Sequence, residues 1–153
     1  MNSPDAPLFS KLVRLMNLTV RPFHDQVGRQ HHLTLNEWRV MALLAVQPGL
    51  SAARLSELTG LDKMSVSRAL TGLASQDRLQ RTPDPHDQRR QCLRLSPQGL
   101  ALHQQIQPLA NEREAELFRG LNPARRVRLE KSLDDLIEVL SQGPGSDARG
   151  RPH

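Results

Sequence analysis

The chain has 153 residues, a formal net charge of +5, and 37% hydrophobic, 24% charged and only 3% aromatic residues. This length fits one domain with a complete hydrophobic core, and a second independent domain would be hard to accommodate. The absence of Tyr and the scarcity of other aromatic residues argue against a binder of single-stranded RNA, which stacks bases on aromatic rings. The excess of Arg suits a polyanionic partner, although a genome whose Lys codons have drifted to Arg would give the same charge.

The single cysteine, Cys92, excludes an intrachain disulfide bond and fits a reducing compartment. The sequence shows neither the pattern of a secretory signal peptide nor an apolar run approaching the roughly 20 residues of a membrane span. We therefore expect a cytoplasmic protein that has no membrane partner.

The first predicted helix runs from Pro7 to about Val20 and is apolar around more of its circumference than a surface helix requires. Such a helix needs a second partner surface. Pro22 should kink or interrupt it before it continues to about residue 30. Its apolar positions are Leu8, Phe9, Leu12, Val13, Leu15, Met16 and Val20.

Capping residues mark the next two helices. Thr34 and Glu37 have the spacing of a capping box and open a helix that a Pro-Gly pair ends. Ser51 caps a short helix over residues 52–58, which stops at Gly60, a residue that adopts the left-handed conformation of a helix C-terminus without strain.

Asp62 caps a third helix, which runs from about Lys63 to Gln76. One face carries apolar residues at helical spacing, Val66, Leu70 and Leu73. Small hydroxyls and cations on the other face would let the backbone approach a DNA groove, although a solvated face has the same composition. These polar positions are Lys63, Ser65, Ser67, Arg68 and Thr71.

Two short alternating runs, 78–82 and 91–95, predict paired strands joined by the loop 83–90, PDPHDQRR. Pro83 and Pro85 stiffen this loop, and Arg89 and Arg90 lie near its tip or on its return side. A stiff basic hairpin loses little entropy on binding, which suits insertion of Arg into a minor groove. A helix-turn-helix followed by such a hairpin is typical of a winged helix-turn-helix.

Ser-Pro at positions 96–97 and Asn-Pro at 122–123 open two further helices, and a Gly/Pro-rich tail over 141–153 is expected to be disordered. Pro108 should kink the first of them. The expected fold is mainly α with a small β-wing (α+β), a single domain over 7–140. In it, 34–95 form the DNA-binding unit. The helices of 7–30 and 96–140 pair with those of a second copy, so that two recognition helices lie roughly 34 Å apart on a near-palindromic site.

The sequence resembles the MarR family of bacterial transcriptional regulators from about Leu8 to Leu140. The most specific match is the wing's Asp-x-Arg followed by Leu-Ser-x-x-Gly. The matching segments are Leu33-Thr34-Leu35-Asn36-Glu37-Trp38-Arg39-Val40-Met41, Leu55-Ser56-Glu57-Leu58, Ser65-Val66-Ser67-Arg68, Asp87-Gln88-Arg89-Arg90 and Leu95-Ser96-Pro97-Gln98-Gly99.

This resemblance implies a homodimer that reads an inverted repeat and usually represses nearby genes until a small ligand or cysteine oxidation releases it. It implies DNA contacts by Ser65, Ser67, Arg68 and Arg89, and an Asp87 that holds the loop of that arginine in shape by ion pairing. Reasoning from the residues alone adds Lys63, Met64, His86 and Arg90.

The sequence departs from the family's commonest form at several positions. Gly72 and Ser75 weaken the predicted recognition helix, and Arg78 precedes Leu79 where the family often has Gly-Leu. The first helix lacks the reactive cysteine of thiol-sensing members, and we interpret Cys92 as an inert, semi-buried thiol.

The resemblance also implies an effector crevice between the dimer helices and the winged unit. A carboxylate ligand would need a cationic side chain, and an aromatic ligand would need an aromatic side chain to pack against. Because the candidates offer both, we expect the ligand to be a small aromatic acid. Trp38 could instead serve only in core packing. Arg39 could instead be an exposed or ion-paired side chain without a ligand. The candidates are Arg14, Met16, Phe23, His24, Trp38 and Arg39.

Three alternatives remain open: metal sensing, a winged module that binds only protein, and an enzyme. Metal sensing would use His24, His31, His32, His103 and Glu37, but the adjacent histidines lack the spacing that converges two imidazoles from one helix, so we expect neither a metal nor a cofactor. We find no phosphate-binding loop, nucleophile elbow or hydrolase motif and expect no enzyme. The sequence does not identify the operator, the regulated genes or the ligand. It also does not show whether the protein represses or activates transcription.

Overall fold

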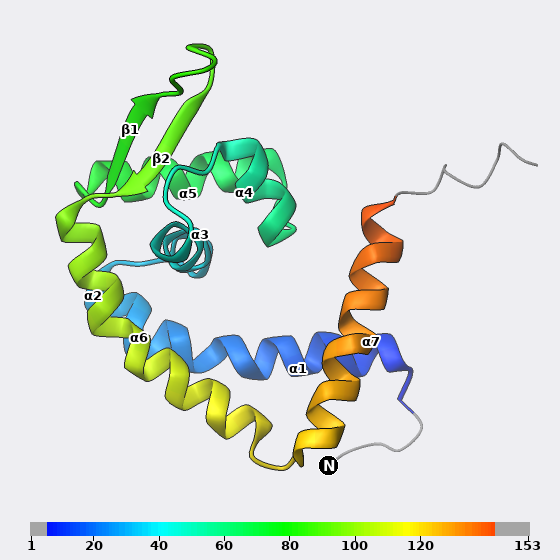
Figure 1. Cartoon of the computed structure of the whole chain (residues 1–153). Coiled ribbons are helices and arrows are strands. Elements are labelled where there is room, and N and C mark those ends of the chain that lie inside the picture. Colours follow the sequence, from blue (N-terminus) through cyan, green and yellow to red (C-terminus); the bar gives the residue numbers. More distant parts are fainter. Residues whose placement is uncertain (1–5, 143–153) are drawn as a thin grey trace, which may run out of the picture. The chain divides into compact units, whose positions relative to one another are not determined.

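The computed structural model describes residues 6–142, apart from the side chain of His24, and Figure 1 shows its course. The chain divides into two compact units, residues 1–110 and 111–153, and helix α6 (Pro97–Phe118) belongs to both. The second unit also holds α7 (Pro123–Ser141). The elements of the first unit are α1 (Leu8–Phe23), the π-helical turn η1 (His24–Gly28), α2 (Arg29–His31), α3 (Leu35–Val46), α4 (Ala52–Thr59), α5 (Lys63–Ser75), β1 (Leu79–Pro83) and β2 (Gln91–Leu95).

The predicted fold class is confirmed, because a mainly helical chain carries a single two-stranded antiparallel sheet among its described residues. Helices α4 and α5 meet at a turn, and Figure 1 shows the β1–β2 hairpin extending beyond them. None of the helices in residues 6–142 is long and apolar enough to cross a lipid bilayer.

The core of the first unit lies where α3, α4, α5 and β2 pack together. The predicted apolar face of α5 is confirmed, since Val66, Leu70 and Leu73 are at most 3% exposed, and Ala69 joins them. Burial of this face orients the opposite face of α5 outward. The other fully buried side chains are Val40, Met41, Leu44, Leu55 and Leu93.

The predicted caps are confirmed atom by atom. The Thr34 hydroxyl accepts from the Glu37 N–H at 3.2 Å, and a Glu37 carboxylate oxygen accepts from the Thr34 N–H at 2.6 Å. Ser51 accepts from the third N–H of α4 at 3.2 Å, and Gly60 ends that helix with φ 70°. The helix-turn-helix is therefore specified locally, by residues next to the helix ends.

The predicted interruption of the first helix lies slightly after Pro22. Helix α1 continues through Pro22 to Phe23, and the irregularity follows as the π-helical turn His24–Gly28. A proline cannot donate the hydrogen bond of its own turn, yet the helical course survives there and the wider turn comes directly after it.

The predicted start of the wing is wrong by one residue, because Arg78 is buried rather than part of β1. Its guanidinium donates from Nη2 to the His31 carbonyl at 2.7 Å, and the Gln76 amide donates to the His32 carbonyl at 3.1 Å. Burial lowers the pKa of the Arg78 guanidinium, and the Glu37 carboxylate opposes that shift. The end of α5 is therefore tied to the turn that follows α2.

The second unit is built on α7 and the end of α6. Asn122 caps α7, as predicted, by accepting from the Arg125 N–H at 2.9 Å. Arg126 binds Glu114 at 2.8 Å and lies over the Phe118 ring at 4.9 Å. The predicted tail begins too early, because Ser141 still belongs to α7, and residues 143–153 lie outside the described part of the chain.

Candidate nucleic-acid interface

The outward face of α5 presents the predicted DNA-contacting residues from its first two turns. Lys63, Ser67 and Arg68 are exposed, and Met64 is 65% exposed although it is apolar. Among residues 6–142, Arg68 donates only to the Met64 carbonyl of its own helix, at 3.4 Å. These side chains are therefore available to a partner of α5.

Ser65 has a local role at the start of the same helix. Its N–H donates to the Asp62 carboxylate at 2.8 Å and its hydroxyl donates at 2.7 Å. These bonds, the hydroxyl first, lower the pKa of the Asp62 carboxyl. Ser67 has no such partner among residues 6–142, so it is the less engaged of the two hydroxyls.

The wing loop is shaped by two aspartates. Asp84 accepts from the His86 N–H at 2.8 Å, and Asp87 accepts from the Arg89 N–H at 3.0 Å. Asp87 also forms an ion pair within the loop, with Arg90 at 3.4 Å, which agrees with the role that the resemblance implies for it. Across the described part of the chain the Arg89 guanidinium has no partner, so the loop presents it unpaired.

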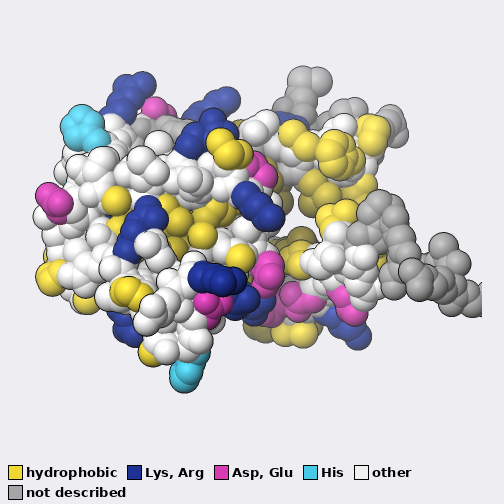
Figure 2. All heavy atoms as spheres, turned by 90° about the horizontal axis from the view of Figure 1, so that it is seen from above, with side chains coloured by type: hydrophobic (Ala, Val, Ile, Leu, Met, Phe, Trp, Pro, Cys, Tyr) yellow, Lys and Arg dark blue, Asp and Glu magenta, His cyan; other side chains and the backbone are white. Residues whose placement is uncertain are grey.

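Two hollows lie between α5 and the wing. The smaller, about 260 Å³, is lined by Lys63 and Ser67 of α5 and by Arg81 of β1. The larger, about 620 Å³, is lined by Arg89 and Arg90 as well as Arg81. Figure 2 views this side of the molecule and shows Lys and Arg side chains spread across it. The structure thus joins predicted residues of both elements in one basic surface.

Not every predicted contact lies along these hollows. Ser65 and Arg68 line a separate depression with residues of α3, and His86 is exposed in the wing loop. The sequence analysis missed Arg54 of α4 and Arg81, which both line the larger hollow. Strand alternation could have identified Arg81, because it pairs with the buried Leu93 and so shares that residue's face.

The six predicted effector residues separate into groups. Met16 and Arg39 line one surface pocket between α1 and α3. Phe23 and Trp38 contact each other, with ring centroids 6.4 Å apart, and both pack against the core. Arg14 is exposed on α1 outside that pocket, and the side chain of His24 lies outside the described residues.

The Trp38 ring also stacks on His103 of α6, with centroids 5.2 Å apart and the planes tilted by 16°. Burial lowers the pKa of His103, and a hydrogen bond with Gln107 opposes the shift. His103 is thus held as a neutral ring that packs against Trp38. No three His, Cys, Asp or Glu side chains within the described ranges are grouped so that they could hold a metal ion.

Comparisons with known proteins agree with this geometry. A model of the MarR family matches residues 31–90, from the turn after α2 to the end of the wing loop. A putative transcriptional regulatory protein for the hcr operon of Thauera aromatica is 24% identical over 126 residues, which are 82% of this chain and 76% of that protein.

Among solved structures, Bordetella bronchiseptica BpsR, whose DNA binding is regulated by 6-hydroxynicotinic acid, is 26% identical with a TM-score of 0.77. The match covers 89% of this chain and 96% of that one. A crystal structure of MarR is 22% identical, with a TM-score of 0.74 over 93% of this chain and 96% of that one, and shows the same fold.

Proposed function

Because the chain belongs to the MarR family of DNA-binding transcriptional regulators, we propose that it is a homodimeric repressor of a near-palindromic operator that a small aromatic acid releases. The observation that carries this proposal is the basic surface shared by α5 and the wing, in which Lys63, Arg81 and Arg89 line two hollows that have Arg81 in common. In this proposal α5 enters a major groove and Arg89 reaches the neighbouring minor groove.

The dimer is supported by the apolar faces that the helices of 7–30 and 96–140 leave exposed. No residue of α1 or α7 is buried, and Phe9 and Leu140 are 76% and 81% exposed. Apolar faces of this extent mark an interaction surface. Sedimentation analysis should give twice the protomer mass, and Leu12→Glu should lower it to one protomer.

The effector proposal is supported by the regulation of BpsR by 6-hydroxynicotinic acid and by the pocket that Met16 and Arg39 line. Within the described part of the chain Arg39 makes a single long hydrogen bond, 3.5 Å, to Asn36, so its guanidinium is available to a carboxylate. Calorimetry with 6-hydroxynicotinic, nicotinic and benzoic acids should show binding that Arg39→Gln weakens. No binding by any of these acids, and no effect on DNA affinity, would remove the proposal.

The DNA proposal is tested by the affinity for a duplex across a range of salt concentrations. Arg89→Ala should weaken binding and lower the salt slope by about one unit for each lost phosphate contact. Arg94→Ala is the matched control, because Arg94 is an exposed arginine that follows the buried Leu93 and so points to the other face of the hairpin. Absent or salt-independent binding by the wild-type protein would refute the proposal.

A further inference from the structure

Met64 places an exposed thioether on the outward face of α5. Its side chain is 65% exposed, whereas Met41 is fully buried and Met16, on α1, is 49% exposed. Met64 is therefore the most accessible methionine in the described part of the chain. It follows Lys63 in the first turn of the helix, so an oxidant in solution reaches its sulfur without any unfolding.

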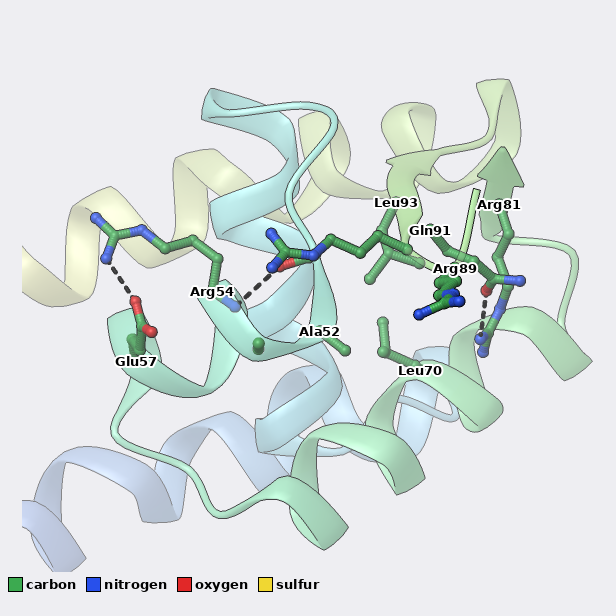
Figure 3. A pocket seen from close by; sticks show the side chains of 11 residues that line it. Ala52, Arg54, Glu57, Leu70, Arg81, Arg89, Gln91 and Leu93 are labelled. Carbon is green, nitrogen blue, oxygen red and sulfur yellow. Dashed lines mark hydrogen bonds and ion pairs between the residues drawn. The ribbon is translucent and has the colours of Figure 1, made fainter. Parts of the chain in front are cut away.

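The two hollows beside α5 offer an oxidant no second sulfur atom. Figure 3 shows the larger hollow, with Arg81 and Arg89 on its wing side, and none of the residues that line it contains sulfur. The same holds for the smaller hollow. Cys92, the only cysteine, pairs with Thr82 and so lies on the opposite face of the hairpin from Arg81. In the described part of the chain, oxidation of the basic surface would therefore act through Met64.

Arg68 lies one helical turn after Met64. Residues four positions apart are neighbours on a helix surface, and the Arg68 Nε atom already donates to the Met64 carbonyl at 3.4 Å. The guanidinium thus lies back over the turn that carries the sulfur. Arg68 has no ion pair among residues 6–142, so a new acceptor on the Met64 side chain would meet no competing carboxylate.

Oxidation changes the Met64 side chain from an apolar group into a hydrogen-bond acceptor. A lone pair of the sulfur attacks one oxygen of hydrogen peroxide, the O–O bond breaks and an S–O bond forms. The departing hydroxide takes the proton from the transferred oxygen and leaves as water, so the sulfur loses two electrons and the peroxide gains them. A polar sulfoxide no longer suits apolar contact with a thymine methyl group, and its oxygen can accept from Arg68.

We propose that Met64 is an oxidation site at which a peroxide lowers the affinity for DNA, because the sulfoxide removes an apolar contact and holds Arg68 back against its own helix. The inference rests on the proposed function. The change is reversible, since methionine sulfoxide reductases restore the thioether while two thiols become a disulfide and the oxygen leaves as water. Unlike cysteine oxidation, it needs no partner thiol in the protein.

The test measures DNA binding before and after treatment with hydrogen peroxide, in a Cys92→Ser background that removes the thiol. The probe is a duplex that the untreated protein selects from a random-sequence pool, and mass spectrometry locates the added oxygen. Oxidation of Met64 should weaken binding about tenfold, which is within the usual cost of one mismatched base pair. Thermal melting verifies the fold. If Cys92→Ser does not fold, the protein that keeps Cys92 gives the same answer, because recovery should then require the reductases in addition to a thiol.

Each variant is compared with itself before and after treatment. Met64→Leu should lose the sensitivity to peroxide, and Met16→Leu, the matched control, should keep it. Arg68→Gln should reduce the effect, because the sulfoxide then has no guanidinium to hold away from DNA. Untreated Met64→Gln, which carries a neutral polar side chain, should bind about as weakly as the oxidised wild type.

The outcomes separate the two proposals. Unchanged affinity once Met64 is oxidised, or a loss of affinity that persists in Met64→Leu, overturns the oxidation site and leaves the proposed function intact. A loss that Met16→Leu abolishes also overturns it, as does a Met64 that stays unoxidised under conditions that oxidise free methionine. Failure of the untreated protein to select any duplex overturns both proposals.

Discussion

Substitution of Gly72 by Ala in α5 should destabilise the protein, although the same change inside a helix ordinarily stabilises it by about 1 kcal/mol. A Cβ at Gly72 would overlap the Oε1 atom of Glu37 and come within 2.9 Å of its Cδ. Glu37 is 6% exposed, and its other oxygen holds the Thr34 N–H at 2.6 Å. The added methyl group therefore displaces a buried carboxylate from its capping box.

The magnitude follows from the interactions that are lost. Loss of the cap costs about 1 kcal/mol, and moving a buried carboxylate away from its donor and from Arg78 costs a further 1–3 kcal/mol, roughly. After the gain in helix propensity, we expect a net loss of about 2 kcal/mol.

Urea denaturation at one fixed protein concentration measures this change. Gly120→Ala is the control, because no atom lies within 4 Å of the Cβ it would carry. In a Glu37→Ala background the sign should reverse, and Gly72→Ala should then stabilise by about 1 kcal/mol. A Gly72→Ala protein at least as stable as the wild type would refute the reasoning.

Two further predictions concern pH. The Ser65 hydroxyl and N–H hold the pKa of Asp62 below its ordinary 3.8, so the charged cap contributes stability above that value and loses it as the pH falls through the folded pKa. The melting temperature of Asp62→Asn should therefore fall less between pH 6 and pH 3 than that of the wild type, and parallel curves would contradict this. Burial holds the pKa of His103 below 6.5, so stability is complete above pH 6.5 and declines below it, as the unfolded chain takes up the proton first. Between pH 7.5 and 5.5, the His103→Gln protein should lose less stability than the wild type. Unfolding can be followed by the fluorescence of Trp38, the only tryptophan in the sequence. An equal loss in both proteins would show that His103 is not responsible.

The helix-turn-helix could be predicted because the residues that cap its helices are close in sequence to the helix ends. Thr34, Ser51 and Asp62 each accept from an N–H three residues ahead, and the burial of α5 follows the 3.6-residue period of its own sequence. The sequence identifies Gly72 as a residue of low helix propensity. Its compensating role, room for the Glu37 carboxylate, depends on a residue 35 positions away and could not be found from α5 alone.

Long-range contacts account for most of what the sequence concealed. The hydrogen bonds of Gln76 and Arg78 span 44 and 47 residues, so no local pattern assigns them. The sequence places Arg54 in a short helix and gives it no further role. Arg54 lines a hollow because the wing lies beside α4. The resemblance implies an ion pair of Asp87 within the wing loop but not its partner, which is Arg90.

The two ends of α5 differ in their attachment to the rest of the first unit. Its C-terminal end is held to the carbonyls of His31 and His32, while the residues proposed to meet DNA lie at its N-terminal end, 13 residues of helix away or about 20 Å. Rotation by roughly 10° about the attached end would carry the N-terminal end through an arc of roughly 3.5 Å, which exceeds the length of one hydrogen bond. In such a rotation the helix would act as a lever arm about an attachment next to the turn that follows α2, so that a small change of angle there would give a larger displacement at its tip.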